Sequence, residues 1–301
     1  MTTSKRLEKP IIFVSIGRTG STIIANILSK HPSLAYPSNY QDIYPKSRRA
    51  NYRRRIIHSQ LYRLLRIKKI LKKLSLVPNK YLDFNPSEAY AMWDHLMDDK
   101  VDFSRGFLLN DTLSKEHINS IRAYFDVMVK NQGKKRLTFK ITGPSRIGFL
   151  LQIFPDALFI NVTRNHIPTV SSFLKVNFWK ERGMHQLWWR GVYTKEDKEW
   201  AKENKENGAL MTAFQIKKIE EITNQELATH DIDYIQVIYE NFLSNPSAEM
   251  QRMVDFTKLE PFNFDSETKK IRTGHKFKKD TDYFPESELE ELYKILYRKG
   301  K

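Results

Sequence analysis

The feature that most constrains the fold is a short apolar run that ends at a glycine and leads into a helical pattern. Ile11–Ile16 is dominated by β-branched residues, which is typical of a buried strand. Thr22–Ser29 carries apolar residues at helical spacing, and His31–Pro32 ends that pattern. The loop between them, Gly17–Thr22, reads Gly-Arg-Thr-Gly-Ser-Thr. This order of strand, glycine loop and helix is the part of an α/β protein where a phosphate group usually binds.

The loop has the chemistry of an anion site. Gly17 and Gly20 let backbone N–H groups converge on an anion, and the start of the following helix adds a positive potential. Arg18, Ser21 and Thr22 supply side-chain donors. The loop is not a Walker loop, because that motif places a lysine where this chain has Ser21, and the dinucleotide motif G-x-G-x-x-G is absent. The alternative is a strand–helix turn without a ligand.

A second run of alternating elements lies further along the chain. Leu137–Thr142 and Ala157–Thr163 are predicted strands, and each is followed by a helical pattern. Strands that alternate with helices predict a parallel sheet with right-handed crossovers. Arg164 follows the second strand directly, and Ser172 lies on the helix after it. Because ligands of open α/β sheets bind at the carboxyl ends of strands, this arginine and serine are candidates for holding a second phosphate.

These patterns predict one α/β domain over residues 1–301, built in three layers around a central parallel sheet, with a helical insertion at 46–76. Two further strands are predicted at Tyr234–Tyr239 and, as a short one, near Phe107–Leu109. The predicted helices outside the insertion and the first loop are Glu116–Asn131, Ser145–Phe154, Ile167–Phe178, Asn204–Thr229, Asn245–Lys258 and Pro285–Arg298. The insertion is expected to form one or two amphipathic helices.

Most of the net charge lies in that insertion. The formal net charge is +16, and twelve Lys or Arg residues fall within 46–73, where no acidic residue lies between Asp42 and Asp83. Such a block attracts phosphate groups, sulfate groups or anionic surfaces. The chain has no cysteine, which excludes disulfides, thiolate metal sites and cysteine nucleophiles. Because no run of 18 apolar residues and no apolar leader is present, we expect a cytoplasmic protein, with membrane association through 46–73 as an open possibility.

The glycine loop resembles the 5′-phosphosulfate-binding loop of sulfotransferases that use 3′-phosphoadenosine 5′-phosphosulfate (PAPS), which have a P-loop-NTPase-like fold. The residues that this resemblance places on the 5′-phosphate are Gly17, Arg18, Thr19, Gly20, Ser21 and Thr22. Arg164 and Ser172 fall on the family's 3′-phosphate motif. Arg272 is a partial match to a late arginine–lysine–glycine loop that contacts the same phosphate. Ile23 stands where cytosolic members often have an adenine-stacking tryptophan.

The resemblance also implies in-line transfer of a sulfuryl group without a metal ion. Lys140, in Lys140-Ile141-Thr142-Gly143-Pro144, is similar to the lysine of the family's Lys-x-His-x-Pro strand end. Arg18 and Lys140 are therefore predicted to stabilise the charge that develops on the leaving phosphate. Removal of such a contact is expected to lower the rate by about 10²–10³.

The general base is where the chain departs from the family. Thr142 stands at the position of the histidine base of cytosolic members, and Asn39 stands near the glutamate of other branches. Neither side chain is a base at neutral pH. Asp42 is the nearest carboxylate and is the predicted catalytic base, with Asp111 and His58 as alternatives.

The predicted function is transfer of a sulfuryl group from PAPS to a hydroxyl or amine of an acceptor, with 3′-phosphoadenosine 5′-phosphate (PAP) as product. The acceptor is left open as a glycan, a lipid or a small molecule, and an anionic acceptor or headgroup would suit the basic insertion. Trp179, Trp188 and Trp189, with Phe178, are candidates for either an acceptor pocket or the core. The alternatives are a kinase-like enzyme that uses a nucleoside triphosphate and a basic nucleic-acid-binding protein, although the latter leaves the two phosphate motifs unexplained.

Overall fold

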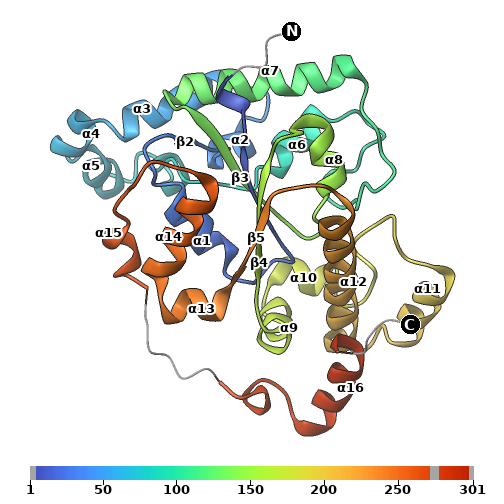
Figure 1. Cartoon of the computed structure of the whole chain (residues 1–301). Helices are drawn as coiled ribbons and strands as arrows, with labels where there is room; N and C mark the ends of the chain where they lie inside the picture. Colours follow the sequence, from blue (N-terminus) through green and yellow to red (C-terminus); the bar gives the residue numbers. More distant parts are fainter. Residues whose placement is uncertain (1–4, 272–277, 298–301) are drawn as a thin grey trace.

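The computed structural model describes residues 5–271 and 278–297, which fold around a parallel sheet (Figure 1). The strands are β1 (Ile11–Ser15), β2 (Leu34–Ala35), β3 (Arg136–Thr142), β4 (Leu158–Thr163) and β5 (Tyr234–Ile238). Their order in the sheet is β2-β3-β1-β4-β5, and each neighbouring pair is parallel. The predicted α/β fold with a central parallel sheet is confirmed.

β1 lies inside the sheet, because both of its edges are paired. Ile11 is in register with Thr138 of β3 and with Leu158 of β4. All residues of β1 are buried, which accounts for its continuous apolar sequence. The chain leaves β1 toward β2 and β3 on one side and then crosses to β4 and β5 on the other. The carboxyl end of β1 is therefore a switch point, where ligands of open α/β sheets bind.

Helices cover both faces of the sheet (Figure 1). The helices are α1 (Ser21–Leu28), α2 (Asn39–Ile43), α3 (Arg53–Ile57), α4 (Gln60–Leu64), α5 (Ile67–Lys73), α6 (Tyr90–Leu96), α7 (Lys115–Gln132), α8 (Ile147–Ile153), α9 (His166–Leu174), α10 (Asn177–Glu181), α11 (Lys195–Glu203), α12 (Gly208–Thr229), α13 (Tyr239–Ser244), α14 (Pro246–Thr257), α15 (Asp265–Thr268) and α16 (Glu286–Leu296). Helices α6, α7 and α8 pack against Ile12 and Val14 of β1, whereas α1, α13 and α14 pack against Ile11 and Phe13. Alternate residues of β1 thus face opposite layers, as the pleat of a strand requires.

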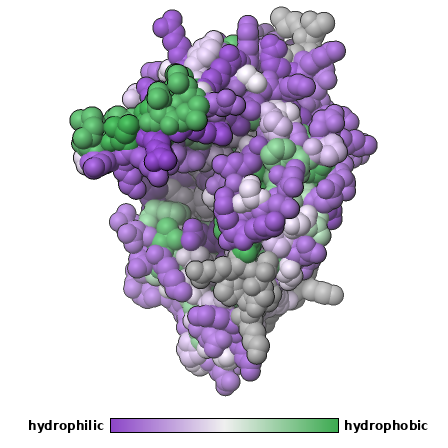
Figure 2. All heavy atoms as spheres, turned by 90° about the vertical axis from the view of Figure 1, so that its left-hand side faces the viewer, coloured by the Kyte–Doolittle hydropathy of each residue, from purple (hydrophilic) through white to green (hydrophobic). Residues whose placement is uncertain are grey.

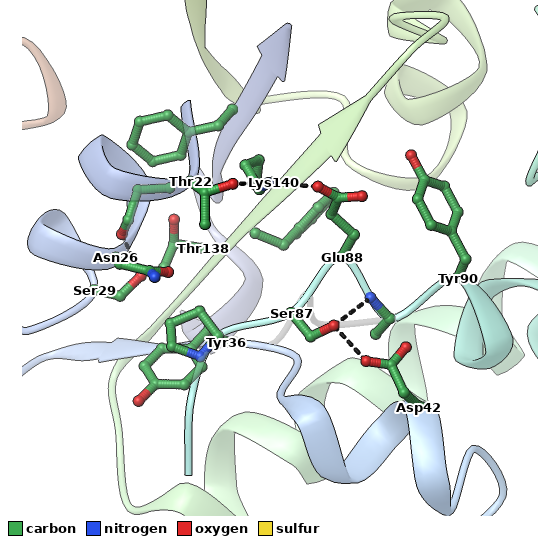
Figure 3. A pocket seen from close by; sticks show the side chains of 15 residues that line it. Thr22, Asn26, Ser29, Tyr36, Asp42, Ser87, Glu88, Tyr90, Thr138 and Lys140 are labelled. Carbon is green, nitrogen blue, oxygen red and sulfur yellow. Dashed lines mark hydrogen bonds and ion pairs between the residues drawn. The ribbon is translucent and has the colours of Figure 1, made fainter. Parts of the chain in front are cut away.

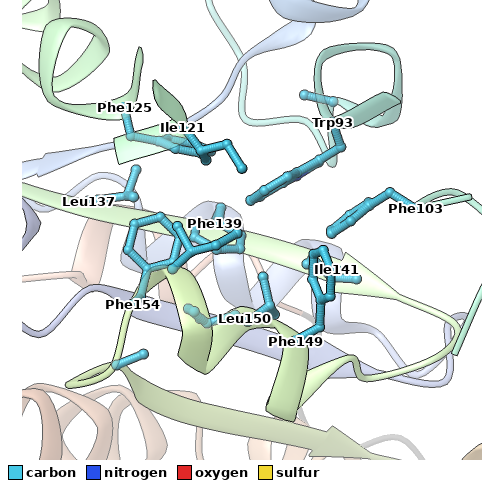
Figure 4. Close-up of a cluster of buried hydrophobic side chains, with 14 of the residues drawn as sticks. Trp93, Phe103, Ile121, Phe125, Leu137, Phe139, Ile141, Phe149, Leu150 and Phe154 are labelled. Carbon is cyan, nitrogen blue, oxygen red and sulfur yellow. The ribbon is translucent and has the colours of Figure 1, made fainter. Parts of the chain in front are cut away.

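Aromatic rings form the core between β3 and helices α6 to α8 (Figure 4). Phe139 of β3 stacks with Phe125 of α7 at 6.0 Å between ring centroids, and Trp93 of α6 stacks on Phe103 at 4.4 Å. All four side chains are buried. Trp93 also packs on Phe139, at 5.4 Å between ring centroids, which holds α6 against β3 and places the loop directly before α6 near the carboxyl end of that strand.

The sequence predicted the strands better than it predicted the connections. The predicted strands confirmed to within one residue at each end are Ile11–Ile16, Leu137–Thr142, Ala157–Thr163 and Tyr234–Tyr239. The strand predicted near Phe107–Leu109 is wrong. Leu108 has a left-handed φ of 57°, which a strand does not allow, and the pairing nearby is an isolated bridge between Gly106 and Arg190.

Three helical predictions also need correction. The helix predicted at Asn204–Thr229 begins only at Gly208, because Asn207 is extended and its side chain caps the helix. The helix predicted at Ile167–Phe178 is divided into α9 and α10, because Val176 is extended. The insertion forms several short helices instead of one or two, because Ser59 is extended and Arg66 is left-handed where a helix would have continued. None of the helices within the described ranges is both long and apolar enough to span a bilayer.

Candidate active site

The loop after β1 has a left-handed backbone at three positions. The φ angles are 102° at Gly17, 59° at Arg18 and 80° at Gly20. Backbone turns of this kind form concave sites whose N–H groups bind anions. Gly20 is required for a second reason, because a Cβ atom at that position would lie 2.2 Å from the ring of Tyr239. The loop therefore has the backbone of the predicted phosphate cradle.

Helix α1 begins at this loop with an uncapped N-terminus. Gly20 is its N-cap residue, no side chain among the described residues caps the helix, and the first turn has no acidic residue. The Ser15 hydroxyl donates to the Ser21 hydroxyl at 2.8 Å, which fixes the start of the helix to β1. Thr19 is fully buried, and its hydroxyl has no hydrogen-bond partner among the described residues. The first N–H groups of α1 and its dipole thus remain to be satisfied by an anion.

The two predicted phosphate motifs lie beside each other. Arg18 Nε donates to Ser172 Oγ at 3.1 Å, and Arg164 Nη1 donates to the carbonyl oxygen of Arg18 at 3.0 Å. The guanidinium of Arg164 lies over the ring of Tyr239, 5.0 Å from its centroid. Arg164 Nε is buried and has no partner within the described ranges. All of these residues line one cavity of about 380 Å³, and their assignment to particular phosphates stays a prediction.

Lys140 lines the same cavity from β3 and is held by two partners. Its ammonium group donates to Thr22 Oγ1 at 2.8 Å and forms an ion pair with Glu88. The side chains of this pair are only 11% (Lys140) and 27% (Glu88) exposed. The other carboxylate oxygen of Glu88 accepts a hydrogen bond of 3.0 Å from Thr142 Oγ1. Glu88 therefore lies between the predicted catalytic cation and the residue that stands at the histidine position.

The loop that carries Glu88 is anchored at both ends. Asn39 donates its N–H to the carbonyl oxygen of Asn85 at 3.0 Å, and the N–H of Asn85 donates to Asn39 Oδ1 at 3.1 Å. The Tyr90 hydroxyl donates to the carbonyl oxygen of Thr142 at 2.6 Å and accepts from its N–H at 3.2 Å. Burial raises the pKa of the Tyr90 phenol, so it remains a donor at neutral pH. Asn39 is therefore a positioning residue for the loop that supplies a glutamate.

A second cavity, of about 300 Å³, shares the side chains of Thr22, Glu88 and Lys140 with the first (Figure 3). Asp42 lies on its wall and accepts a hydrogen bond from the Ser87 hydroxyl. Burial raises the pKa of the Asp42 carboxyl; the bond from Ser87 lowers it, and the negative charge of Glu88 raises it. The predicted catalytic Asp42 thus faces the second cavity, and its role stays a prediction.

The predicted aromatic cluster divides between the core and the site. Trp179 is 1% exposed and packs in the core. Trp188 stacks on two arginine side chains outside the two cavities. Trp189 and Phe178 line the first cavity together with Ile23. The first cavity therefore combines cations with apolar surface.

The other sequence candidates lie elsewhere. Neither Asp111 nor His58 lines the two cavities, and His58 lines a separate surface hollow beside Lys68 and Asp83. Arg272 lies outside the described residues. In the part of the chain that the structure describes, no group of three or more His, Cys, Asp or Glu side chains is placed to hold a metal ion.

Sequence reasoning missed Glu88. Its contacts with Lys140 and Thr142 join positions 52 and 54 residues apart, which no local pattern reveals. One signal was present: Glu88 is the first glutamate after Glu8, and it lies directly before a helix. Asp83 and Glu88 are the first two carboxylates after the long basic stretch, and both were candidates for the partner of Lys140.

A sequence model of the Sulfotransferase family matches residues 10–263, a range that includes both cavities. The chain belongs to the sulfotransferase family. The fold of this sulfotransferase is similar to that of sulfotransferase STF9 from Mycobacterium avium, with a TM-score of 0.56 and 17% identity over 95% of this chain and 75% of that one. It is also similar to sulfotransferase STF1 from Mycobacterium tuberculosis H37Rv, with a TM-score of 0.50 and 17% identity over 96% and 76% of the two chains. No curated protein sequence matches it significantly.

Proposed function

We propose that this sulfotransferase transfers the sulfuryl group of PAPS to a hydroxyl or amine of its acceptor by in-line displacement. The observation that carries the proposal is the convergence of Arg18, Lys140 and Arg164 on one cavity that shares Glu88 with a second cavity. The first cavity thus has cations suited to a nucleotide with two phosphate groups, and the second cavity, on the other side of the Glu88 carboxylate, has space for an acceptor.

The first cavity fits a nucleotide that carries phosphate groups at two positions of its ribose. The N-terminus of α1 and Arg18 suit a 5′-phosphosulfate, while Arg164 and Ser172 suit a 3′-phosphate. The start of α1 and the Nε of Arg164, which have no capping side chain and no partner among the described residues, leave donors for these oxygens. Ile23 and Phe178, both partly exposed, give apolar surface for the purine. When bound, PAPS supplies the sulfuryl group and leaves as PAP.

Arg18 and Lys140 place positive charge where the leaving oxygen becomes negative. Charges fixed in advance at such a point stabilise the transition state with little reorganisation. β3 carries Lys140, and the loop after β1 carries Arg18. The pairing of these two strands therefore fixes the backbone positions from which both side chains reach the cavity. Alignment of the reacting atoms adds to the effect, because the cavities meet at Lys140.

Glu88 is the general base of the proposed reaction. Its carboxylate contacts Lys140 and Thr142 and lies on the wall that both cavities share. A general base has to reach the acceptor's proton close to the transferring group, and this position meets the requirement. When Lys140 turns toward the nucleotide, one carboxylate oxygen of Glu88 is freed to accept that proton. Asp42, which accepts a hydrogen bond from Ser87, lines the second cavity but not the first, and we assign it to binding of the acceptor.

The second cavity sets a limit on the acceptor. Its volume of about 300 Å³ suits a small molecule or the end of a larger one, such as a glycan or a lipid. Aromatic side chains, including Tyr36 and Phe139, line it together with the polar Asn26 and Asp42. A hydroxyl or amine on an otherwise moderately apolar group fits such a lining.

Isothermal titration calorimetry with PAP beside 5′-AMP tests the nucleotide assignment. We expect PAP to bind far more tightly than AMP, because only PAP carries the 3′-phosphate. The substitution Arg164→Ala should raise the Kd of PAP by about tenfold to a hundredfold and leave that of AMP nearly unchanged. Arg252→Ala on α14 is the matched control, since it removes a surface guanidinium that is paired with Glu249.

Three results would contradict the assignment. Equal affinities for PAP and AMP would remove the role of the 3′-phosphate. Magnesium-dependent binding of ATP that is tighter than binding of PAP would favour a kinase-like enzyme. Tight binding of DNA or RNA that falls steeply with salt and competes with PAP would favour a nucleic-acid-binding protein.

A further inference from the structure

The basic insertion divides into two halves with different environments. In the first half, Arg54 is 4% exposed and donates to the carbonyl oxygen of Leu34 and to the side-chain oxygen of Gln132, both at 2.7 Å. Arg55 donates to the carbonyl oxygen of Lys130, also at 2.7 Å. In the second half, neither α4 nor α5 has a buried residue. The first half, which contains α3, therefore packs into the protein, whereas the second half, which contains α4 and α5, lies on its surface.

The second half presents aliphatic side chains to solvent. Their exposed fractions range from 51% for Ile70 to 77% for Leu64. We call this set the apolar ridge; its members are Leu61, Leu64, Leu65, Ile70, Leu74 and Leu76. Figure 2 shows a hydrophobic strip at the edge of the molecule, on the side where α4 and α5 lie, against a mostly hydrophilic face. Exposed apolar surface of this extent marks an interaction site.

Positively charged side chains accompany the ridge. The exposed cations of α4, α5 and their connection that form no ion pair with a described carboxylate are Arg63, Arg66, Lys69, Lys72 and Lys73. Lys68 is paired with Asp83 at 2.7 Å. No acidic residue lies between Asp42 and Asp83 in the sequence. The segment that carries the apolar ridge therefore has positively charged side chains and no negatively charged ones.

We propose that the apolar ridge docks this protein on the surface of an anionic lipid bilayer. Such a surface offers acyl chains to the aliphatic side chains and phosphate groups to the cations beside them. A nucleic acid would match the cations but offers no apolar surface for six exposed aliphatic side chains. The second half is held to the protein by Tyr62, whose hydroxyl donates to the carbonyl oxygen of Leu82, and by Lys68, which pairs with Asp83. These contacts leave the ridge free to contact a surface. The proposal does not depend on the identity of the sulfuryl donor.

Vesicle flotation of the full chain tests the proposal. We expect the protein to float with vesicles of phosphatidylcholine mixed with phosphatidylglycerol, and not with vesicles of phosphatidylcholine alone. A triple variant, Leu61→Ser, Leu64→Ser and Leu74→Ser, should lower the partition coefficient on anionic vesicles by about tenfold or more. Circular dichroism and thermal melting should show this variant folded, because the side chains that it changes are exposed.

A second pair of variants tests whether vesicle binding depends on the lysines beside the ridge or only on the net charge of the protein. Lys69→Gln, Lys72→Gln and Lys73→Gln together should lower partitioning by roughly a hundredfold, since each lysine near an anionic surface contributes a several-fold factor. The matched control, with the same change in charge on α11, is Lys195→Gln, Lys198→Gln and Lys202→Gln. This control should float as the unmodified protein does.

The absence of cysteine allows a direct measurement of insertion. A Leu64→Cys variant, labelled with an environment-sensitive fluorophore, should show a blue shift with anionic vesicles, and a labelled Lys202→Cys variant on α11 should show none. Failure of the unmodified protein to float with anionic vesicles would overturn the proposal. So would equal flotation of the leucine variant, or binding of duplex DNA that exceeds vesicle binding and survives the leucine substitutions.

Discussion

Replacement of Glu88 by glutamine separates the proposed base from its scaffold. Glutamine keeps the size of the side chain and retains an oxygen for the hydrogen bond from Thr142, which is 3.0 Å long in the structure. It lacks the proton affinity of a carboxylate and cannot form the ion pair with Lys140. Loss of a general base typically lowers kcat by about 10²–10⁴, which corresponds to about 3–5 kcal/mol in the barrier.

Nucleotide affinity should change in the opposite direction. In the proposed reaction, Lys140 leaves Glu88 for the nucleotide, and the two side chains are mostly shielded from solvent, at 11% and 27% exposure. Without the competing carboxylate, PAP should bind equally well or up to about tenfold more tightly, a gain of about 1.4 kcal/mol at most. The free energy of unfolding should fall by only about 1 kcal/mol, because the amide keeps hydrogen-bonding capacity.

Steady-state kinetics with two probe acceptors gives the decisive assay. Phenol needs a base to take its proton, whereas 4-nitrophenol is far more acidic, is partly ionised at neutral pH and needs less help. Glu88→Gln should therefore lower kcat strongly with phenol and much less with 4-nitrophenol. Glu88→Asp should recover part of the lost rate, and Asp42→Asn serves as the matched control, since it neutralises the other carboxylate of the second cavity.

The outcome that refutes this reasoning is specific. An equal loss of kcat with both phenols would show that Glu88 supports the structure of the site and does not take the proton. A larger loss for Asp42→Asn than for Glu88→Gln with phenol would transfer the role of base to Asp42.

Two further expectations concern the backbone and the pH dependence of stability. Gly20→Ala should lower PAP affinity at least about tenfold, because its Cβ would lie 2.2 Å from the Tyr239 ring. Gly191→Ala is the control for backbone strain, since Gly191 also has a positive φ but the nearest atom to its Cβ would be 4.0 Å away. This control should leave PAP affinity unchanged. The pKa of His58 is lowered from 6.5 to about 4, first by burial and then by the charge of Arg54. Because the unfolded chain takes up the proton more readily than the folded protein, the free energy of unfolding is highest above pH 6.5 and falls as the pH is lowered toward 4. His58→Gln should remove this loss, about 1–3 kcal/mol, from denaturant unfolding curves measured at neutral pH and near pH 4. Identical pH profiles for the two proteins would count against it.

The central strands could be predicted from sequence because burial on both faces leaves a continuous apolar run, as in β1 and β4. β2 could not, since Leu34–Ala35 is too short to carry a pattern. The breaks in the insertion also escaped prediction. They depend on the backbone at Ser59 and Arg66, residues that a continuous helix would have accepted.

The site was predictable where its residues directly follow strands. Arg18 and Arg164 come after β1 and β4, and a parallel sheet brings such positions to one edge whatever the intervening sequence. Glu88 reaches the site from a loop, and its place is decided by Lys140, Thr142 and the aromatic packing of α6. Contacts of this kind exist only after the chain has folded, so no local spacing reports them.

The ion pair between Lys140 and Glu88 has a consequence for the order of events. Without a nucleotide, both carboxylate oxygens of Glu88 already accept a hydrogen bond, one from Lys140 and one from Thr142, so an acceptor that arrives first meets a carboxylate held by these two partners. If Glu88 is the base, as proposed, a nucleotide that draws the lysine away would free this base in the same movement. We therefore expect the nucleotide to enter before the acceptor, because one rotation of the Lys140 side chain would link occupation of the first cavity to reactivity in the second.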